Sequence, residues 1–102
     1  AASDVYKRQV CDALASPSPG ALTFPILQRR VTQGFSVTDE EVLETLAWAF
    51  KYLKLVLEPG GAAALAAVYH GKVRPSGGTI AITLSGANVD PPLFAEALSR
   101  FG

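Results

Sequence analysis

The chain has 102 residues, the size of one small domain with room for a modest core. Its nine basic and nine acidic side chains balance, so its charge gives no reason to expect nucleic acid or an anionic membrane surface as a partner. No apolar run reaches the roughly 18 to 20 residues that cross a bilayer, and we expect neither a membrane span nor a secretory signal. The single cysteine, Cys11, suits a reducing cytoplasm, and we expect it to be a small buried residue.

The first nine residues differ from the rest of the chain. Residues 1–9 are polar and lack the periodicity of a core element, and residues 4–9 (DVYKRQ) resemble the translation of a transposon adapter used in preparing sequencing libraries. We therefore expect residues 1–9 to be an adapter-derived leader. Residues 10–102 would then be an incomplete domain whose gene continued upstream of Val10, and an ordinary disordered terminus is the alternative for the leader.

Apolar spacing predicts four helices, at residues 24–31, 38–55, 62–70 and 91–101. The clearest begins at Thr38, where Thr38 and Glu41 have the spacing of a capping box. Val37 and Val42 flank this start as a hydrophobic staple. These signals fix where the second helix begins.

Two stretches, residues 35–37 and 79–84, are typical of β-strands. The second (TIAITL) is β-branched at four positions and carries no charge, which predicts a strand buried on both faces in the middle of a parallel sheet. Helices alternating with strands predict an α/β fold with a partial parallel sheet and packed helices. Because two strands cannot form that sheet alone, the strand at residues 79–84 needs neighbours on both sides.

The strand at residues 79–84 ends in a small polar turn, Ser85-Gly86-Ala87-Asn88, before the last helix. Ligands of open α/β sheets gather beyond the carboxyl ends of the strands, so this turn is a candidate site. The chain has one histidine, His70, and neither of the usual phosphate loops, so we expect no metal site and no histidine-based triad. We expect His70 to be a surface residue at a helix end.

Four motifs, in order, resemble the end of a threonine/serine dehydratase, a fold-type II pyridoxal-phosphate enzyme of the group that includes serine racemase. The strongest are residues 58–62 (EPGGA) and 85–90 (SGANVD). Residues 11–14 (CDAL) are similar to the family's ADGL turn, and residues 35–41 (FSVTDEE) to its V(T/S)DEE helix start. The resemblance covers residues 10–102 and implies the C-terminal part of a tryptophan synthase β-like large domain.

The resemblance also implies roles for individual residues. Ser85 matches the serine whose hydroxyl hydrogen-bonds the pyridine nitrogen of pyridoxal phosphate, and Gly86 would let the backbone approach the ring. Glu58 matches an acid near the ring with a supporting electrostatic role. Ser16 falls where relatives contact the substrate carboxylate, whereas Asn88 is expected only to shape the turn.

The family's Schiff-base lysine and phosphate loop would lie upstream of Val10. Lys51, Lys54 and Lys72 stand in helix or loop contexts unlike that of the catalytic lysine, so this chain alone is expected to be inactive. Two departures are Ala13, where the family has glycine, and Gly60, where Ser, Thr or Ala is commoner.

The implied activity of the parent is β-elimination of threonine or serine to a 2-oxo acid and ammonia, in a cytoplasmic homodimer. A serine racemase or a hydroxyaspartate ammonia-lyase of the same family would look alike in this stretch. A second hypothesis is a non-enzymatic α/β module that binds a partner beside residues 79–84 and unfolds cooperatively. The dehydratase hypothesis instead predicts that this chain aggregates or is molten in isolation, because its strand edges are unpaired.

Overall fold

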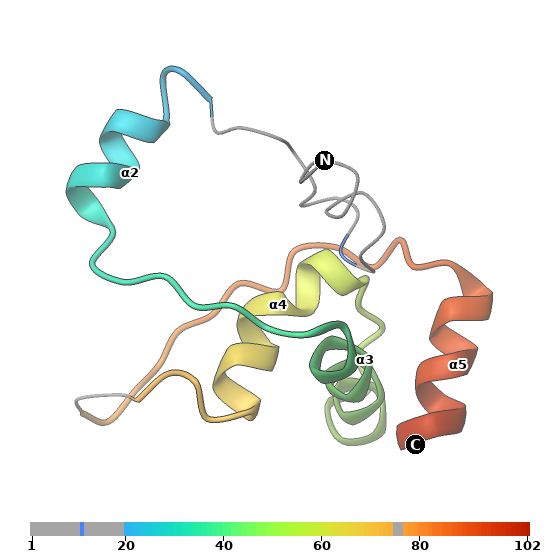
Figure 1. Cartoon of the computed structure of the whole chain (residues 1–102). Coiled ribbons are helices and arrows are strands. Elements are labelled where there is room, and N and C mark those ends of the chain that lie inside the picture. The colour runs from blue at the N-terminus through green and yellow to red at the C-terminus, as the bar shows by residue number, and fades with distance from the viewer. Residues whose placement is uncertain (1–10, 12–19, 75–76) are drawn as a thin grey trace.

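The computed structural model describes residues 11, 20–74 and 77–102. Helix α3 lies between α4 and α5, whereas α2 stands apart at the end of an extended segment (Figure 1). No helix in this part of the chain is long and apolar enough to cross a lipid bilayer. Residues 1–9, the expected leader, fall outside the described residues. The elements are α2 (Phe24–Arg30), α3 (Asp39–Trp48), the π-helical turn η2 (Ala49–Leu53), α4 (Pro59–Tyr69) and α5 (Pro91–Phe101).

The prediction of a partial parallel sheet is wrong for the described residues, none of which forms a β-strand. Residues 32–37 and 79–84 are both extended, but neither makes a backbone hydrogen bond to another described residue. A strand is defined by a hydrogen-bonded neighbour, so an extended segment without one is not a strand. The prediction that residues 79–84 are buried on both faces is also wrong. Ile82 and Leu84 pack against the core, but the alternate positions Thr79, Ala81 and Thr83 are exposed.

The predicted start of α3 is confirmed. The Thr38 amide donates to Glu41 Oε1 at 2.8 Å, and the Glu41 amide donates to Thr38 Oγ1 at 3.1 Å, which completes the capping box. Val37 packs against a small buried cluster of Cys11, Val42 and Ala66, as the staple predicted. Cys11 is buried, which confirms the prediction that it is a small buried residue.

The end of this helix differs from the prediction of one helix reaching residue 55. After Trp48 the backbone widens into η2, and Lys54 stops it in the left-handed region at φ 60°. The wider turn rotates the side chains that follow it. Phe50 and Leu53, which lie within η2, are 39% and 43% exposed.

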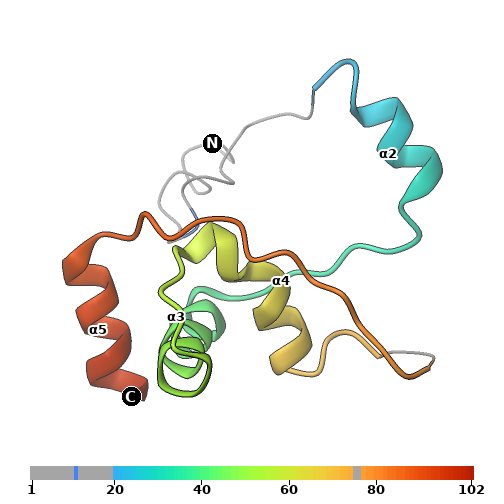
Figure 2. The same ribbon diagram turned by 180° about the vertical axis from the view of Figure 1, so that it is seen from behind.

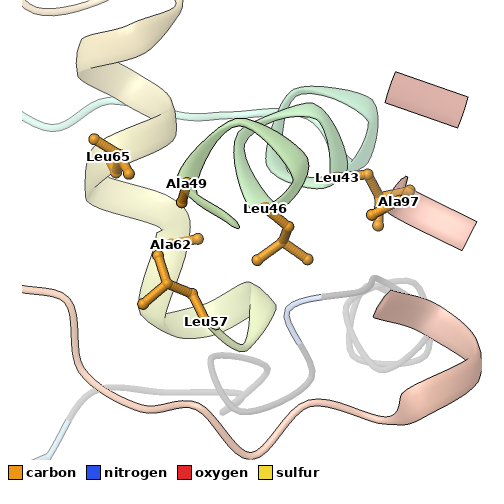
Figure 3. Packing of buried hydrophobic residues seen from close by; sticks show 7 residues of the cluster. All are labelled: Leu43, Leu46, Ala49, Leu57, Ala62, Leu65 and Ala97. Carbon is orange, nitrogen blue, oxygen red and sulfur yellow. The ribbon is translucent and has the colours of Figure 1, made fainter. Parts of the chain in front are cut away.

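The main core joins α3, η2, α4 and α5 (Figure 3). Helix α4 begins at Pro59, three residues before its predicted start, because proline suits the first turn of a helix and Glu58 takes the N-cap position. Helix α5 spans its predicted residues, although the Asp90 side chain makes no capping hydrogen bond. The buried members of the core are Leu43, Leu46, Ala49, Leu57, Ala62, Leu65 and Ala97.

A polar cluster ties the C-terminal end of α4 to the N-terminal half of α3. His70 Nε2 lies 3.2 Å from the Glu41 carbonyl oxygen and 3.2 Å from Glu44 Oε2, and Lys72 Nζ lies 2.8 Å from Glu41 Oε1. The side chain of His70 is only 18% exposed, so its prediction as a surface residue is wrong. The Lys72 ammonium and the Thr38 amide lower the pKa of Glu41 to about 2.

We expect this cluster to make the packing of α3 sensitive to acid. Because the pKa of Glu41 in the folded chain is below its ordinary value of 4.5, its contribution is present above pH 4.5 and is lost as the pH falls through about 2. We expect amide protection in α3 to fall over that interval, and to fall less in Glu41→Gln. Hydrogen exchange at stepped pH, corrected for the intrinsic rate, measures this. Glu96→Gln, on the exposed side of α5, is the control and should lose as much amide protection in α3 as the unsubstituted chain. If Glu41→Gln lost as much protection as the unsubstituted chain, Glu41 would not be the group responsible.

Candidate functional site

The N-terminal end of α4 packs directly on the turn that follows residues 79–84. The Glu58 amide donates a hydrogen bond of 3.1 Å to the Gly86 carbonyl oxygen. Figure 2 shows how this happens: residues 77–90 run alongside α4 and reach its N-terminal end. The two motifs on which the resemblance chiefly rests, residues 58–62 and 85–90, therefore form one site.

Gly61 makes that approach possible. A Cβ atom at Gly61 would lie 3.0 Å from the Gly86 carbonyl oxygen and 3.1 Å from both the carbonyl carbon and the carbonyl oxygen of Ser85. These are backbone atoms that cannot rotate away, so any side chain at Gly61 would push α4 and the turn apart. This contact was not predicted from the sequence. Its only signal is the second glycine of the Glu-Pro-Gly-Gly run, which becomes informative once α4 is known to begin at Pro59.

The backbone conformation of Gly86 favours glycine, and a side chain there would also have to displace the Glu58 side chain. The φ of Gly86 is +125°, a backbone conformation that residues with side chains rarely adopt. A Cβ atom there would also lie 2.5 Å from Glu58 Oε1. The carboxylate of Glu58 thus occupies the space beside Gly86 that a side chain would otherwise fill. The structure brings together the three residues predicted to contact the cofactor, namely Glu58, Ser85 and Gly86.

Ser85 and Asn88 are both exposed on the turn. Neither side chain makes a hydrogen bond to another residue in the described part of the chain. The Ser85 hydroxyl is therefore available to a ligand, and the Glu58 carboxylate lies beside the neighbouring Gly86.

Other predicted site residues lie elsewhere. Ser16 falls outside the described residues, so its predicted contact with a substrate carboxylate stays a prediction. Lys54 Nζ donates to the Lys51 carbonyl oxygen at 2.9 Å, and Lys72 is ion-paired with Glu41 near the opposite end of α4. None of these three lysines lies at the turn. Within residues 11, 20–74 and 77–102, no three His, Cys, Asp or Glu side chains are grouped so that they could hold a metal ion.

Comparison with known proteins decides the family. A model of the family described as "Pyridoxal-phosphate dependent enzyme" matches residues 2–86. The chain belongs to this family. The predicted family and its cofactor, pyridoxal phosphate, are thereby confirmed.

Named relatives are similar over most of this chain. The L-threonine ammonia-lyase of Thermotoga maritima is 33% identical over 94 residues, which cover 92% of the chain and 23% of that protein. The L-threo-3-hydroxyaspartate ammonia-lyase of a Pseudomonas species is 32% identical over 87% of the chain and 28% of its own length. The serine racemase of Schizosaccharomyces pombe is 31% identical over 91% of the chain and 29% of its own length. The chain thus spans about a quarter of the length of these relatives.

Proposed function

We propose that this chain supplies part of the cofactor site of a pyridoxal-phosphate-dependent ammonia-lyase. The parent would convert threonine or serine into a 2-oxo acid and ammonia. The observation that carries the proposal is the packing of Glu58 and Gly61 against Ser85 and Gly86. It is supported by similarity to two relatives whose names are ammonia-lyases.

The residues of the turn have separate tasks in this proposal. The Ser85 hydroxyl would donate a hydrogen bond to the pyridine nitrogen and, unlike a carboxylate, would not hold that nitrogen protonated. Gly86 lets the backbone of the turn approach the ring, and Glu58 holds the turn through its amide while its carboxylate adds negative charge nearby. Pyridoxal phosphate, when bound, supplies an electron sink for the carbon that bears the amino group of the substrate. A hydroxyl partner makes this sink milder than a carboxylate would, which suits elimination.

The remaining parts of the proposal concern the parent protein. We infer that its Schiff-base lysine comes from a different stretch of polypeptide, because Lys51, Lys54 and Lys72 lie away from the turn and Lys7 falls in the expected leader. We also infer that this chain alone is inactive. Ser16 would contact the substrate carboxylate. The parent would be a cytoplasmic homodimer.

Two other activities of the same family remain candidates for the parent. One relative is named a serine racemase and another an L-threo-3-hydroxyaspartate ammonia-lyase, at nearly the same identity as the threonine enzyme. Supplying threonine, serine and 3-hydroxyaspartate separately to the parent, and measuring both 2-oxo acid and the D-amino acid, distinguishes the three.

The role of Ser85 can be tested in a chimera. In this protein, residues 10–102 of the chain replace the aligned residues of the Thermotoga maritima enzyme. Ser85→Ala removes one hydrogen bond, worth about 0.5–1.5 kcal/mol, so we expect pyridoxal phosphate to bind about 2- to 13-fold more weakly. Equilibrium dialysis with absorbance detection measures the dissociation constant.

The matched control is Ser99→Ala on the exposed side of α5, which should leave that constant unchanged. Equal affinities for the Ser85→Ala and unsubstituted chimeras would refute the role given to the serine.

A further inference from the structure

Two side chains fasten the C-terminal end of α4 to α3. His70 Nε2 lies 3.2 Å from both the Glu41 carbonyl oxygen and Glu44 Oε2. Both neighbours are hydrogen-bond acceptors, so this nitrogen carries the hydrogen and donates to them. Lys72 Nζ lies 2.8 Å from Glu41 Oε1. The side chains of His70 and Lys72 are 18% and 31% exposed, so the contacts are partly shielded from water, and we call these two residues the clamp.

The end of α4 is shaped so that the clamp can form. Gly71 has a φ of +73°, and its amide donates to the Val68 carbonyl oxygen at 3.1 Å. The Lys72 amide donates to the Ala67 carbonyl oxygen at 2.9 Å, which completes a Schellman motif. This motif turns the chain back at Gly71. Lys72, which lies beyond the end of the helix, therefore still reaches Glu41 on α3.

The buried face of α4 is smooth. Apart from Pro59 and Leu65, its buried residues are glycine or alanine, and Ala62 and Leu65 belong to the core shared with α3 (Figure 3). Interdigitating side chains fix how two helices sit on each other, and small ones provide few such ridges. Polar contacts with defined partners can fix the register instead. The clamp supplies contacts of this kind between α4 and α3.

The N-terminal end of α4 is in close contact with the turn that follows residues 79–84. The Glu58 amide donates to the Gly86 carbonyl oxygen at 3.1 Å. A Cβ atom at Gly61 would lie only 3.0–3.1 Å from backbone atoms of Ser85 and Gly86. The 11 residues of α4 form a rod about 16 Å long. A tilt of this rod at its C-terminal end therefore also moves Glu58 and Gly61 relative to the turn.

We propose that the clamp positions α4 against the turn at Ser85 and Gly86. His70 and Lys72 are positioning residues, because they act through the helix and lie at its opposite end. Their effect on pyridoxal phosphate rests on the proposed function, in which this turn meets the ring. Their effect on the contact between α4 and the turn does not, so the two effects are measured separately.

The test uses a double variant of the chimera, His70→Phe/Lys72→Met. It removes the polar contacts of the clamp but keeps a ring beside Tyr69 and the length of the Lys72 side chain. We expect the Glu58 amide to exchange about tenfold faster without cofactor, and pyridoxal phosphate to bind about tenfold more weakly. Lys72→Arg keeps the charge and should leave both values close to those of the unsubstituted chimera. If the double variant does not fold, Lys72→Met alone should change both values about threefold in the same direction.

Arg100→Met is the matched control for the loss of a contact with α3. Arg100 pairs with Glu40 on α3 and with Glu96 on α5, so its removal loosens the attachment of α5 to α3 without releasing α4. Urea unfolding of every variant measures the accompanying loss of stability. We expect Arg100→Met to lose stability but to keep both the exchange rate of the Glu58 amide and the affinity for pyridoxal phosphate.

A double-mutant cycle with Gly61→Ala separates positioning from a general loss of stability. The new Cβ atom already presses α4 and the turn apart, so removing the clamp in this background should weaken cofactor binding less than about twofold. Additive losses of affinity would overturn the proposal. So would an unchanged exchange rate at Glu58, or an equal response in Arg100→Met. Faster exchange at Glu58 with unchanged cofactor affinity would support the clamp and contradict the proposed function of the turn.

Discussion

Replacing Gly86 with alanine in the chimera should weaken pyridoxal-phosphate binding by about 30-fold. The backbone at φ +125° resists any Cβ atom, and that atom would meet Glu58 Oε1 at 2.5 Å. Strain of this kind costs on the order of 1–3 kcal/mol, and about 2 kcal/mol corresponds to the expected change in affinity. The turn can avoid the clash only by moving Ser85 or by displacing Glu58. Equilibrium dialysis measures the loss.

Gly78→Ala is the matched control for this substitution. No atom lies within 4 Å of a Cβ placed at Gly78, and its φ is not in the left-handed region, so the affinity should not change. Hydrogen exchange gives a second measurement: the Glu58 amide, which donates to the Gly86 carbonyl oxygen, should exchange faster in Gly86→Ala. If Gly86→Ala bound the cofactor as tightly as Gly78→Ala, the geometry of the turn would be irrelevant to binding.

Gly61→Ala should change helix stability and cofactor affinity in opposite directions. Alanine is a better helix residue than glycine by about 1 kcal/mol, so the amides in the first turns of α4 should become more protected. The new Cβ atom would also press on the Ser85 and Gly86 carbonyl groups at 3.0–3.1 Å, so the turn must shift. We expect pyridoxal phosphate to bind about tenfold more weakly, which corresponds to about 1.4 kcal/mol.

Gly61→Val extends this test. Valine adds bulk at the same position, so the affinity should fall further while Gly78→Ala again leaves it unchanged. Hydrogen exchange of α4 and dialysis of the cofactor are measured on the same samples. Tighter cofactor binding in Gly61→Ala would mean that helix stability, and not the close approach of α4 to the turn, limits the site.

The sequence predicted the local features well because they depend on neighbouring residues. The capping box at Thr38 and the staple of Val37 and Val42 require only their own spacing. The family followed from the order of short motifs, whereas the contact of Glu58 with Gly86 came only from the structure.

The wrong predictions share a cause, which is that they depend on distant partners. Residues 79–84 have the composition of a central strand, but pairing is a property of two segments, and none of the described residues pairs with them. His70 looked like a surface residue because nothing local indicates that Glu41 and Glu44 lie beside it. The start of α4 was placed too late because Glu-Pro-Gly-Gly suggests a turn, although proline is well suited to the first turn of a helix.

The most direct measurement is ¹⁵N NMR of the chimera loaded with pyridoxal phosphate labelled at its ring nitrogen. If the Ser85 hydroxyl contacts that nitrogen, the resonance of the unsubstituted chimera will be that of an unprotonated, hydrogen-bonded pyridine. The resonance will move in Ser85→Ala, which loses the hydrogen bond. In Ser85→Asp it will shift to the position of a protonated pyridine. A resonance that is the same in all three proteins would show that the ring nitrogen lies away from this turn.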